Sequence, residues 1–140
     1  MPVSVYAAAL REPENLNDIL NITLSYKNGS IGTISYFANG DKSLPKERVE
    51  IFSNGCTAIL DDFKILAIHA KGKKRVKKMM SQDKGQKKEV QVFINSRDKA
   101  CLVSTDNIIG FDEIYSASLV TFKILESIRT GLSINLHNRQ

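Results

Sequence analysis

Histidines and cysteines are too few and too dispersed in this sequence to form a metal site or a thiol-based active site. His69 and His137 are the only histidines, and Cys56 and Cys101 are the only cysteines. Neither histidine has another ligand at the spacing that metal sites require, and no base can be assigned to either cysteine. We interpret His69 as a strand residue and His137 as part of the terminal tail. The sequence predicts no metal site and no catalytic nucleophile.

Two adjacent aspartates, Asp61 and Asp62, follow the apolar run Ala58 to Leu60. A pair of carboxylates can perform acid–base chemistry only when both face one substrate. Neighbouring residues of a strand point to opposite faces, so we interpret this pair as the polar turn that ends a strand. No catalytic residue is therefore assigned in this chain.

Nucleotide-binding glycine motifs are absent from the sequence, because neither G-x-G-x-x-G nor G-x-x-x-x-G-K-[ST] occurs in it. Such loops place backbone N–H groups at the start of a helix, where they hold phosphate. We therefore expect no cofactor-binding residues and no bound cofactor in this chain.

Positive charge is concentrated in one segment, Lys71 to Lys88, which holds nine basic residues and one acid, Asp83. The whole chain has a net charge of +5, so the remainder is mildly acidic. The segment could bind an acidic partner, or its lysines could protect an exposed edge strand from aggregation. It contains no aromatic residue on which a base could stack, which argues against nucleic acid as its partner.

Length and composition indicate one globular domain over residues 1–140. The chain has 42% hydrophobic and 25% charged residues, and no apolar run approaches the roughly 18 residues of a membrane-spanning helix. The first ten residues lack the basic start of a signal peptide. Two cysteines cannot form a disulfide framework, so we expect a cytoplasmic location and no membrane.

Most of the chain has the two-residue period of β-strands. Ile19–Tyr26 and Ile31–Phe37 alternate around Asn28-Gly29, which predicts a hairpin with a type I′ turn. A second hairpin is predicted around Asn54-Gly55, between RVEIFS and CTAIL, and a third around Lys71-Gly72-Lys73, while Val3–Tyr6 predicts a further strand. These strands suggest one largely antiparallel sheet.

The last third has helical periodicity. Phe111–Thr130 places Ile114, Ala117, Thr121, Leu125 and Ile128 on one face, and Gly131 is suited to end the helix. A shorter helix is predicted over Gln86–Asn95, with Val90, Phe93 and Ile94 facing inward. The fold class is therefore α+β, an open-faced, mainly antiparallel sheet with helices packed on one side.

An ordered set of segments resembles a known family. In chain order these are IGTISYFANGDKSLPKERVEIFSNG, AILDDF, QDKGQKKEVQVF and FDEIYSASLVTFKILESIRTG. Together they resemble the C-terminal domain of the Gfo/Idh/MocA family of NAD(P)-dependent oxidoreductases, over roughly residues 16 to 135. The resemblance implies a domain that binds a sugar-like substrate and forms the oligomer. NAD or NADP is expected for the full-length family member.

The resemblance also shows what this sequence lacks. The family's N-terminal Rossmann domain, its Glu-Lys-Pro lysine and the Asp-to-His motif that supplies its acid/base have no counterpart here. Whether the chain is an enzyme is left open by the sequence, but these absences predict that it is inactive alone. The alternative is a stand-alone interaction module whose basic segment, residues 71–88, binds an acidic partner.

Three residues fall at places that the family uses for substrate: Lys46, Lys84 and Gln86. Lysine and glutamine can hydrogen-bond hydroxyls, or pair with a carboxylate or phosphate. Surface polar residues without a ligand are the other interpretation.

The alternating strands also predict an oligomer. They place Thr23, Ser25, Thr33 and Ser35 together on the sheet face opposite Ile22 and Ile34. We expect a homo-oligomer, a dimer in its simplest form, joined through this uncovered face.

Overall fold

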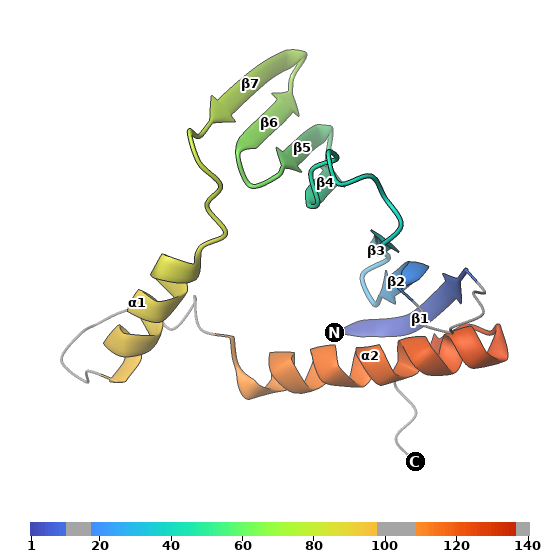
Figure 1. Ribbon diagram of the computed structural model, residues 1–140. Helices are drawn as coiled ribbons and strands as arrows, with labels where there is room; N and C mark the ends of the chain where they lie inside the picture. Colours follow the sequence, from blue (N-terminus) through green and yellow to red (C-terminus); the bar gives the residue numbers. More distant parts are fainter. Residues whose placement is uncertain (11–17, 98–108, 137–140) are drawn as a thin grey trace. The chain divides into compact units, whose positions relative to one another are not determined.

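The computed structural model describes residues 1–10, 18–97 and 109–136, which form two compact units. The units are Met1–Gly40 with Ile109–Gln140, and Asp41–Ile108. The first contains β1 (Pro2–Ala9), β2 (Ile19–Tyr26), β3 (Ile31–Phe37), α2 (Phe111–Thr130) and β8 (Ile134–Asn135). The second contains β4 (Arg48–Ser53), β5 (Cys56–Asp61), β6 (Ile65–Ala70), β7 (Lys73–Lys78) and α1 (Gln86–Arg97) (Figure 1).

The α+β class and the antiparallel pairing are confirmed, but the described strands form two sheets where the sequence predicted one. Sheet A has the order β3-β2-β1-β8, and sheet B has the order β4-β5-β6-β7. The polar stretch between β3 and β4 contains Pro45, which cannot donate a ladder hydrogen bond. This stretch interrupts the series of hairpins. The single-domain interpretation stays a prediction.

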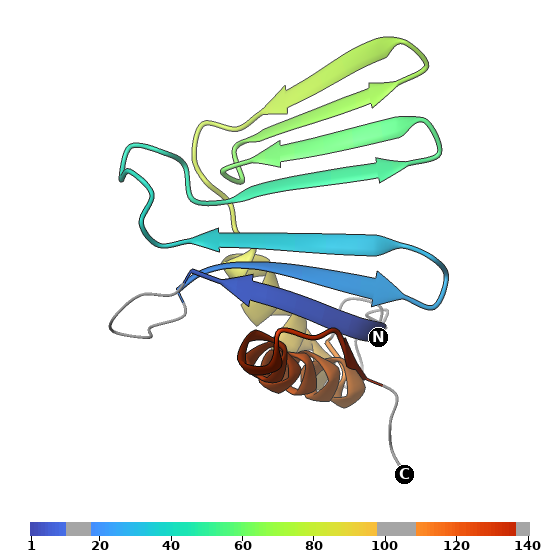
Figure 2. The ribbon, with the colours of Figure 1, turned by 90° about the vertical axis from the view of Figure 1, so that its right-hand side faces the viewer.

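The core of the first unit lies between sheet A and α2, which runs along one face of that sheet (Figures 1 and 2). Ala7 pairs with Ile22 across β1 and β2, and both are buried with Val5. Val120 of α2 and Leu136 complete the buried cluster. For this sheet, the prediction of a helix packed on one side is confirmed.

The predicted inner face of α2 is wrong. Ile114 and Leu125 are 55% and 54% exposed, whereas the buried residues of the helix are Val120 and Ser127, with Ile124 partly buried. Of the predicted face, only Ile128 packs against the core. Periodicity identified one face by its helical spacing, but a buried polar contact of Ser127 sets the rotation of the helix.

That contact links α2 to the end of a strand ladder. β1 pairs with β8 at Ser4–Asn135 and Val5–Ile134, a register in which Ala7 would next face Leu132. Instead, the Ser127 hydroxyl accepts a hydrogen bond from the Ala7 N–H at 2.9 Å. It donates to the Leu132 carbonyl at 2.6 Å. One buried side chain thus completes the ladder where β8 has ended.

The three predicted hairpins are present, with one difference in turn type. Both residues of Asn54-Gly55 and of Lys71-Gly72 have positive φ, as type I′ turns require. At the β2–β3 turn only Gly29 has a positive φ, of 83°. The Tyr26 N–H donates to the Ser30 carbonyl across a three-residue loop. The predicted type I′ turn at Asn28-Gly29 is therefore wrong, because the longer loop places a single residue in the left-handed region.

The short helix is present as α1, but its predicted inner face is wrong. Val90, Phe93 and Ile94 are each more than half exposed, and Val92 is the buried residue. The helix has few apolar residues among its lysines and glutamines, so their spacing defined no clear stripe. Among the described residues, no helix combines the length and hydrophobicity needed to cross a membrane. Cys101 and His137 lie outside the described residues.

Replacing Ser127 by alanine tests the ladder contact. Ser127→Ala would leave the Ala7 N–H and the Leu132 carbonyl buried without their partner, which costs about 1–3 kcal/mol of unfolding free energy. Urea unfolding measures this loss. Ser118→Ala is the control, since Ser118 is an exposed serine of the same helix. Equal stability of the two variants would contradict the role assigned to Ser127.

Candidate functional site

The three predicted substrate residues lie in the second unit, on segments next to sheet B. Lys46 precedes β4, Lys84 lies between β7 and α1, and Gln86 is the first residue of α1. The structure brings Lys84 to Glu47, the residue after Lys46. Lys46 and Gln86 are exposed, and within the described residues the structure shows no side-chain hydrogen bond or ion pair for either.

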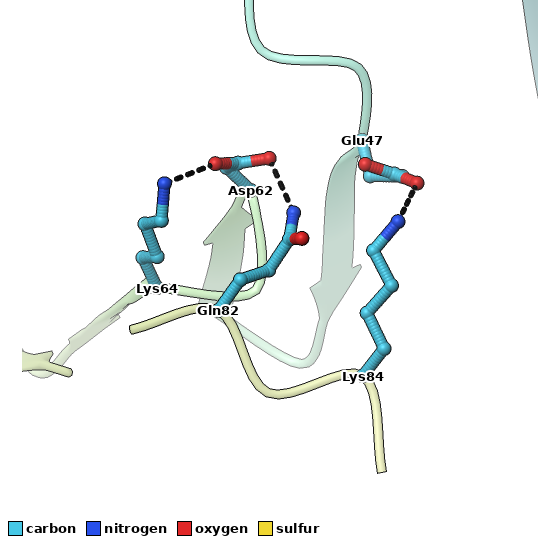
Figure 3. Close-up of polar contacts among 5 residues, drawn as sticks. All are labelled: Glu47, Asp62, Lys64, Gln82 and Lys84. Carbon is cyan, nitrogen blue, oxygen red and sulfur yellow. Dashed lines mark hydrogen bonds and ion pairs between the residues drawn. The ribbon is translucent and has the colours of Figure 1, made fainter. Parts of the chain in front are cut away.

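A polar cluster surrounds Lys84 at the end of sheet B where the β5–β6 turn lies (Figure 3). The Lys84 ammonium is 2.5 Å from Glu47 Oε1. Asp62 Oδ2 is 2.8 Å from the Lys64 ammonium, and Asp62 Oδ1 accepts a hydrogen bond from Gln82 Nε2 at 2.7 Å. We define the polar cluster by these members: Glu47, Asp62, Lys64, Gln82 and Lys84.

A strained turn positions the cluster. Asp62 and Phe63 have φ values of 48° and 52°. These values lie in the left-handed region, which residues other than glycine rarely adopt. The Lys64 N–H donates to the Asp61 carbonyl at 2.9 Å and closes this turn. Such strain persists only where surrounding contacts enforce it, and it is enriched at functional sites.

Backbone hydrogen bonds tie two other chain segments to the turn. The Asp62 N–H donates to the Glu47 carbonyl at 2.8 Å, which joins the turn to the segment before β4. The Asp83 N–H donates to the Phe63 carbonyl at 3.4 Å, which joins it to the segment before α1. The side chains of the cluster are therefore held by backbone contacts as well as by their own charges.

The electrostatics of the cluster keep Asp62 ionised. The hydrogen bond from Lys64 is the main cause that lowers the pKa of Asp62, and the charges of Lys64 and Lys84 and the Gln82 amide lower it further. The Lys84 ammonium also lies 5.9 Å from the centre of the Phe63 ring, within cation–π range. Glu47 Oε2 is buried and has no partner among the described residues.

The arrangement suits binding rather than covalent chemistry. Two carboxylates are matched by two ammonium groups, so the cluster is balanced in charge. It combines hydrogen-bond donors and acceptors within a small area, as recognition of hydroxyl groups requires. Its lysines are engaged by carboxylates, which leaves no free amine to act as a nucleophile.

Sequence reasoning included Lys84 but missed Glu47, Asp62, Lys64 and Gln82. A signal was present, because the two-residue turn at Asn54-Gly55 fixes the register of β4 and β5. That register places Glu47 opposite Asp62. The interpretation of Asp61 and Asp62 as a polar turn is confirmed, and that turn carries the cluster.

The N-termini of the two described helices are poorly suited to hold the pyrophosphate of a dinucleotide. At the start of α2, Glu113 Oε2 accepts the Gly110 N–H at 2.9 Å, and Asp112 adds a second acid to the first turn. At the start of α1, Asp83 Oδ1 accepts the Gly85 N–H at 2.9 Å. Both helix N-termini are thus occupied by carboxylates, which would repel a pyrophosphate.

The pH dependence of stability tests the Asp62 contacts. Because the pKa of Asp62 is lower in the folded state, its carboxylate stabilises the fold above the unfolded pKa, about 4. This contribution is lost as the pH falls through the lower, folded pKa. The stability difference between the parent chain and Asp62→Asn should therefore shrink from pH 7 to about pH 3, as measured by urea unfolding.

Asp61→Asn is the matched control for that measurement. It removes a neighbouring carboxylate for which the described residues provide no ion pair. The unfolding free energies of the parent chain and of Asp61→Asn should therefore differ by the same amount at every pH. A gap between the parent chain and Asp62→Asn that stays constant with pH would show that the Lys64 and Gln82 contacts do not stabilise the charged form.

In comparisons with known proteins, no family model matches the sequence, and no curated protein sequence matches it. Solved structures do match. Levoglucosan dehydrogenase in complex with NADH and levoglucosan is 14% identical, with a TM-score of 0.73, over 99% of this chain and 46% of that chain. An NAD binding oxidoreductase from Klebsiella pneumoniae is 14% identical, with a TM-score of 0.72, over 99% of this chain and 46% of that chain.

The WlbA dehydrogenase from Bordetella pertussis, in complex with NADH and UDP-GlcNAcA, is 20% identical, with a TM-score of 0.54, over 99% of this chain and 40% of that chain. This chain therefore spans less than half of the length of each of these structures. The family resemblance is confirmed at the level of the fold: the chain has the fold of part of a Gfo/Idh/MocA-type NAD-binding oxidoreductase.

Proposed function

We propose that this chain is the substrate-binding and oligomerisation domain of an NAD(P)-dependent oxidoreductase that acts on a sugar or a sugar-derived substrate. One observation carries the proposal. Nearly the whole chain superimposes on less than half of a levoglucosan dehydrogenase that was solved with NADH and a sugar derivative. In this proposal the cofactor is bound by residues outside this sequence, and the enzyme acts in the cytoplasm.

The polar cluster supports the substrate class. Balanced charge disfavours a strongly ionic ligand, whereas carboxylate, amide and ammonium groups side by side can satisfy the donors and acceptors of several hydroxyls. We assign the substrate contacts to Lys46, Lys84 and Gln86, and we add Gln82 and Glu47 to the proposal because they belong to the polar cluster. Each would bind and orient the substrate.

No residue of this chain is proposed to perform the chemical step. The sequence holds no glycine-rich loop, and the described helix N-termini are occupied by acids. Hydride transfer is the chemistry that NAD or NADP supplies when bound. This chain would position the substrate for that transfer. The isolated chain should therefore be inactive. The comparisons give no support to a stand-alone interaction module.

The oligomer is proposed to form through the face of sheet A that α2 leaves uncovered. The register places Tyr6, Thr23 and Thr33 in one row on this face. Ile31 and Phe37 share it and are 73% and 55% exposed. A mixed face of small polar and large apolar residues is suited to pack against a second copy, burying on the order of 1,200 Å² or more.

Ligand titration of the chain tests the binding function. In amide-correlation NMR spectra, levoglucosan or L-sorbose should shift signals of the polar cluster at millimolar concentration, and NADH should cause no shift. Lys84→Met should weaken sugar binding several-fold, because it removes both a donor and the partner of Glu47. Lys88→Met, on exposed α1, is the control and should bind like the parent chain. Micromolar binding of NADH, or no response to any sugar, would overturn the proposal.

Light scattering behind a sizing column tests the oligomer. At several tens of micromolar, the chain should elute with twice its mass of 15.6 kDa. Thr33→Lys should restore the single mass, because it places a charge at the centre of the proposed interface. Ser30→Lys adds the same charge in the β2–β3 turn and should leave the dimer intact. A mass of 15.6 kDa at every concentration would contradict the interface.

A further inference from the structure

A second group of polar side chains lies at the opposite end of sheet B from the polar cluster. Strands of six residues extend about 20 Å, so the two groups are separated by the length of the sheet. The β4–β5 and β6–β7 turns lie at this end of the sheet and border a hollow of about 270 Å³. Its lining includes Gly55, Thr57, His69, Lys71, Gly72 and Lys74.

Strand register places three hydrogen-bond donors of this hollow in one row. Thr57 pairs with His69, and His69 pairs with Lys74, so the three side chains share one face of the sheet. Directly opposed residues have Cβ atoms about 5 Å apart. A hydroxyl, an imidazole and an ammonium group therefore lie side by side, and no carboxylate stands within the row to repel an anion.

The row continues to an aromatic ring. Phe52 pairs with Thr57 across β4 and β5, and its side chain is 70% exposed on the same face. The row thus runs from a flat apolar ring at one edge of the sheet to a cation at the other. We name these four residues, Phe52, Thr57, His69 and Lys74, the cross-strand row.

Positive charge at this end is not compensated. The ion pairs of the second unit engage Arg48, Lys64 and Lys84, and within the described residues no carboxylate pairs with Lys71, Lys73 or Lys74. β7 is an edge strand, and each of its residues is exposed. The end of the sheet therefore attracts anions, in contrast to the charge-balanced polar cluster.

The turns leave room for a ligand. Gly55 and Gly72 have φ values of 72° and 68°, and a Cβ added to either would meet nothing within 4 Å. Both turns are therefore open at the border of the hollow.

We propose that the cross-strand row binds a phosphorylated sugar. The phosphate monoester lies between His69 and Lys74, where imidazole and ammonium donors meet its oxygens. The sugar ring lies over Thr57, whose hydroxyl contacts a ring hydroxyl, and reaches the Phe52 ring. NAD carries phosphate only within its diphosphate bridge and presents no terminal dianion to this row. The ribose 2′-phosphate of NADPH is such a group, so NADPH is a further arm of the titration and should bind less tightly than glucose 6-phosphate.

The test is a calorimetric and NMR titration with glucose 6-phosphate, with inorganic phosphate and glucose as separate arms. Glucose 6-phosphate should bind more tightly than inorganic phosphate, and glucose should not shift the signals of the row. The imidazole nitrogens of His69 should shift on binding, and those of His137 serve as the internal reference.

Three variants locate the site. Lys74→Gln should weaken glucose 6-phosphate binding about tenfold, the loss expected for one charge-assisted hydrogen bond. Lys77→Gln removes the same charge from the same strand but on the opposite face, since Lys77 pairs with Leu66, and should change binding less than twofold. Phe52→Ala should weaken glucose 6-phosphate binding and leave inorganic phosphate binding unchanged.

Two results would overturn the proposal. If Lys74→Gln and Lys77→Gln weaken binding equally, the protein attracts anions through diffuse charge and has no phosphate site at this row. If inorganic phosphate binds as tightly as glucose 6-phosphate, or Phe52→Ala has no effect on either, the row does not recognise a sugar.

Discussion

One buried hydroxyl determines how the first unit is assembled. Ser127 is fully buried on α2, and a buried hydroxyl without hydrogen bonds would cost folding free energy. It avoids that cost only where its oxygen meets the Ala7 N–H and its proton meets the Leu132 carbonyl. These two contacts fix the rotation of α2. They therefore decide that Val120 faces the core while Ile114 and Leu125 face outward.

The rotation of α2 has a consequence for the whole of sheet A. The helix covers the face that carries Val5, Ala7 and Ile22, and it leaves the face of Tyr6 and Thr33 uncovered. Antiparallel sheets tolerate one face in water when that face alternates to polar residues. Here the alternation is incomplete, because Ile31 and Phe37 lie on the uncovered face. A second protein surface would remove these apolar groups from water.

Local sequence patterns predicted the strands, the hairpins and both helices, because each depends on residues close together in the chain. Asn54, Gly55 and Gly72 have the left-handed conformations that their residue types favour. The inner faces of the helices could not be predicted in the same way, since a contact between residues 120 positions apart orients α2. The polar cluster joins segments that hairpin register alone does not connect: Gln82 and Lys84 reach it from beyond β7. The turn at Asp62 and Phe63 carries no glycine that would have indicated its left-handed backbone.

The two ends of sheet B differ in electrostatics because of how their lysines are paired. At the β5–β6 turn, backbone contacts bring Glu47 and Asp62 beside the lysines, so charge is cancelled locally and hydrogen-bonding capacity remains. At the other end, β7 is an edge strand, so acids from a further strand are not available to its cations within the described residues. Lysines on an edge discourage pairing with a second strand, which keeps the sheet from aggregating. The same unpaired charge favours a small anion, because an anion can approach from the face of the sheet without pairing with its edge.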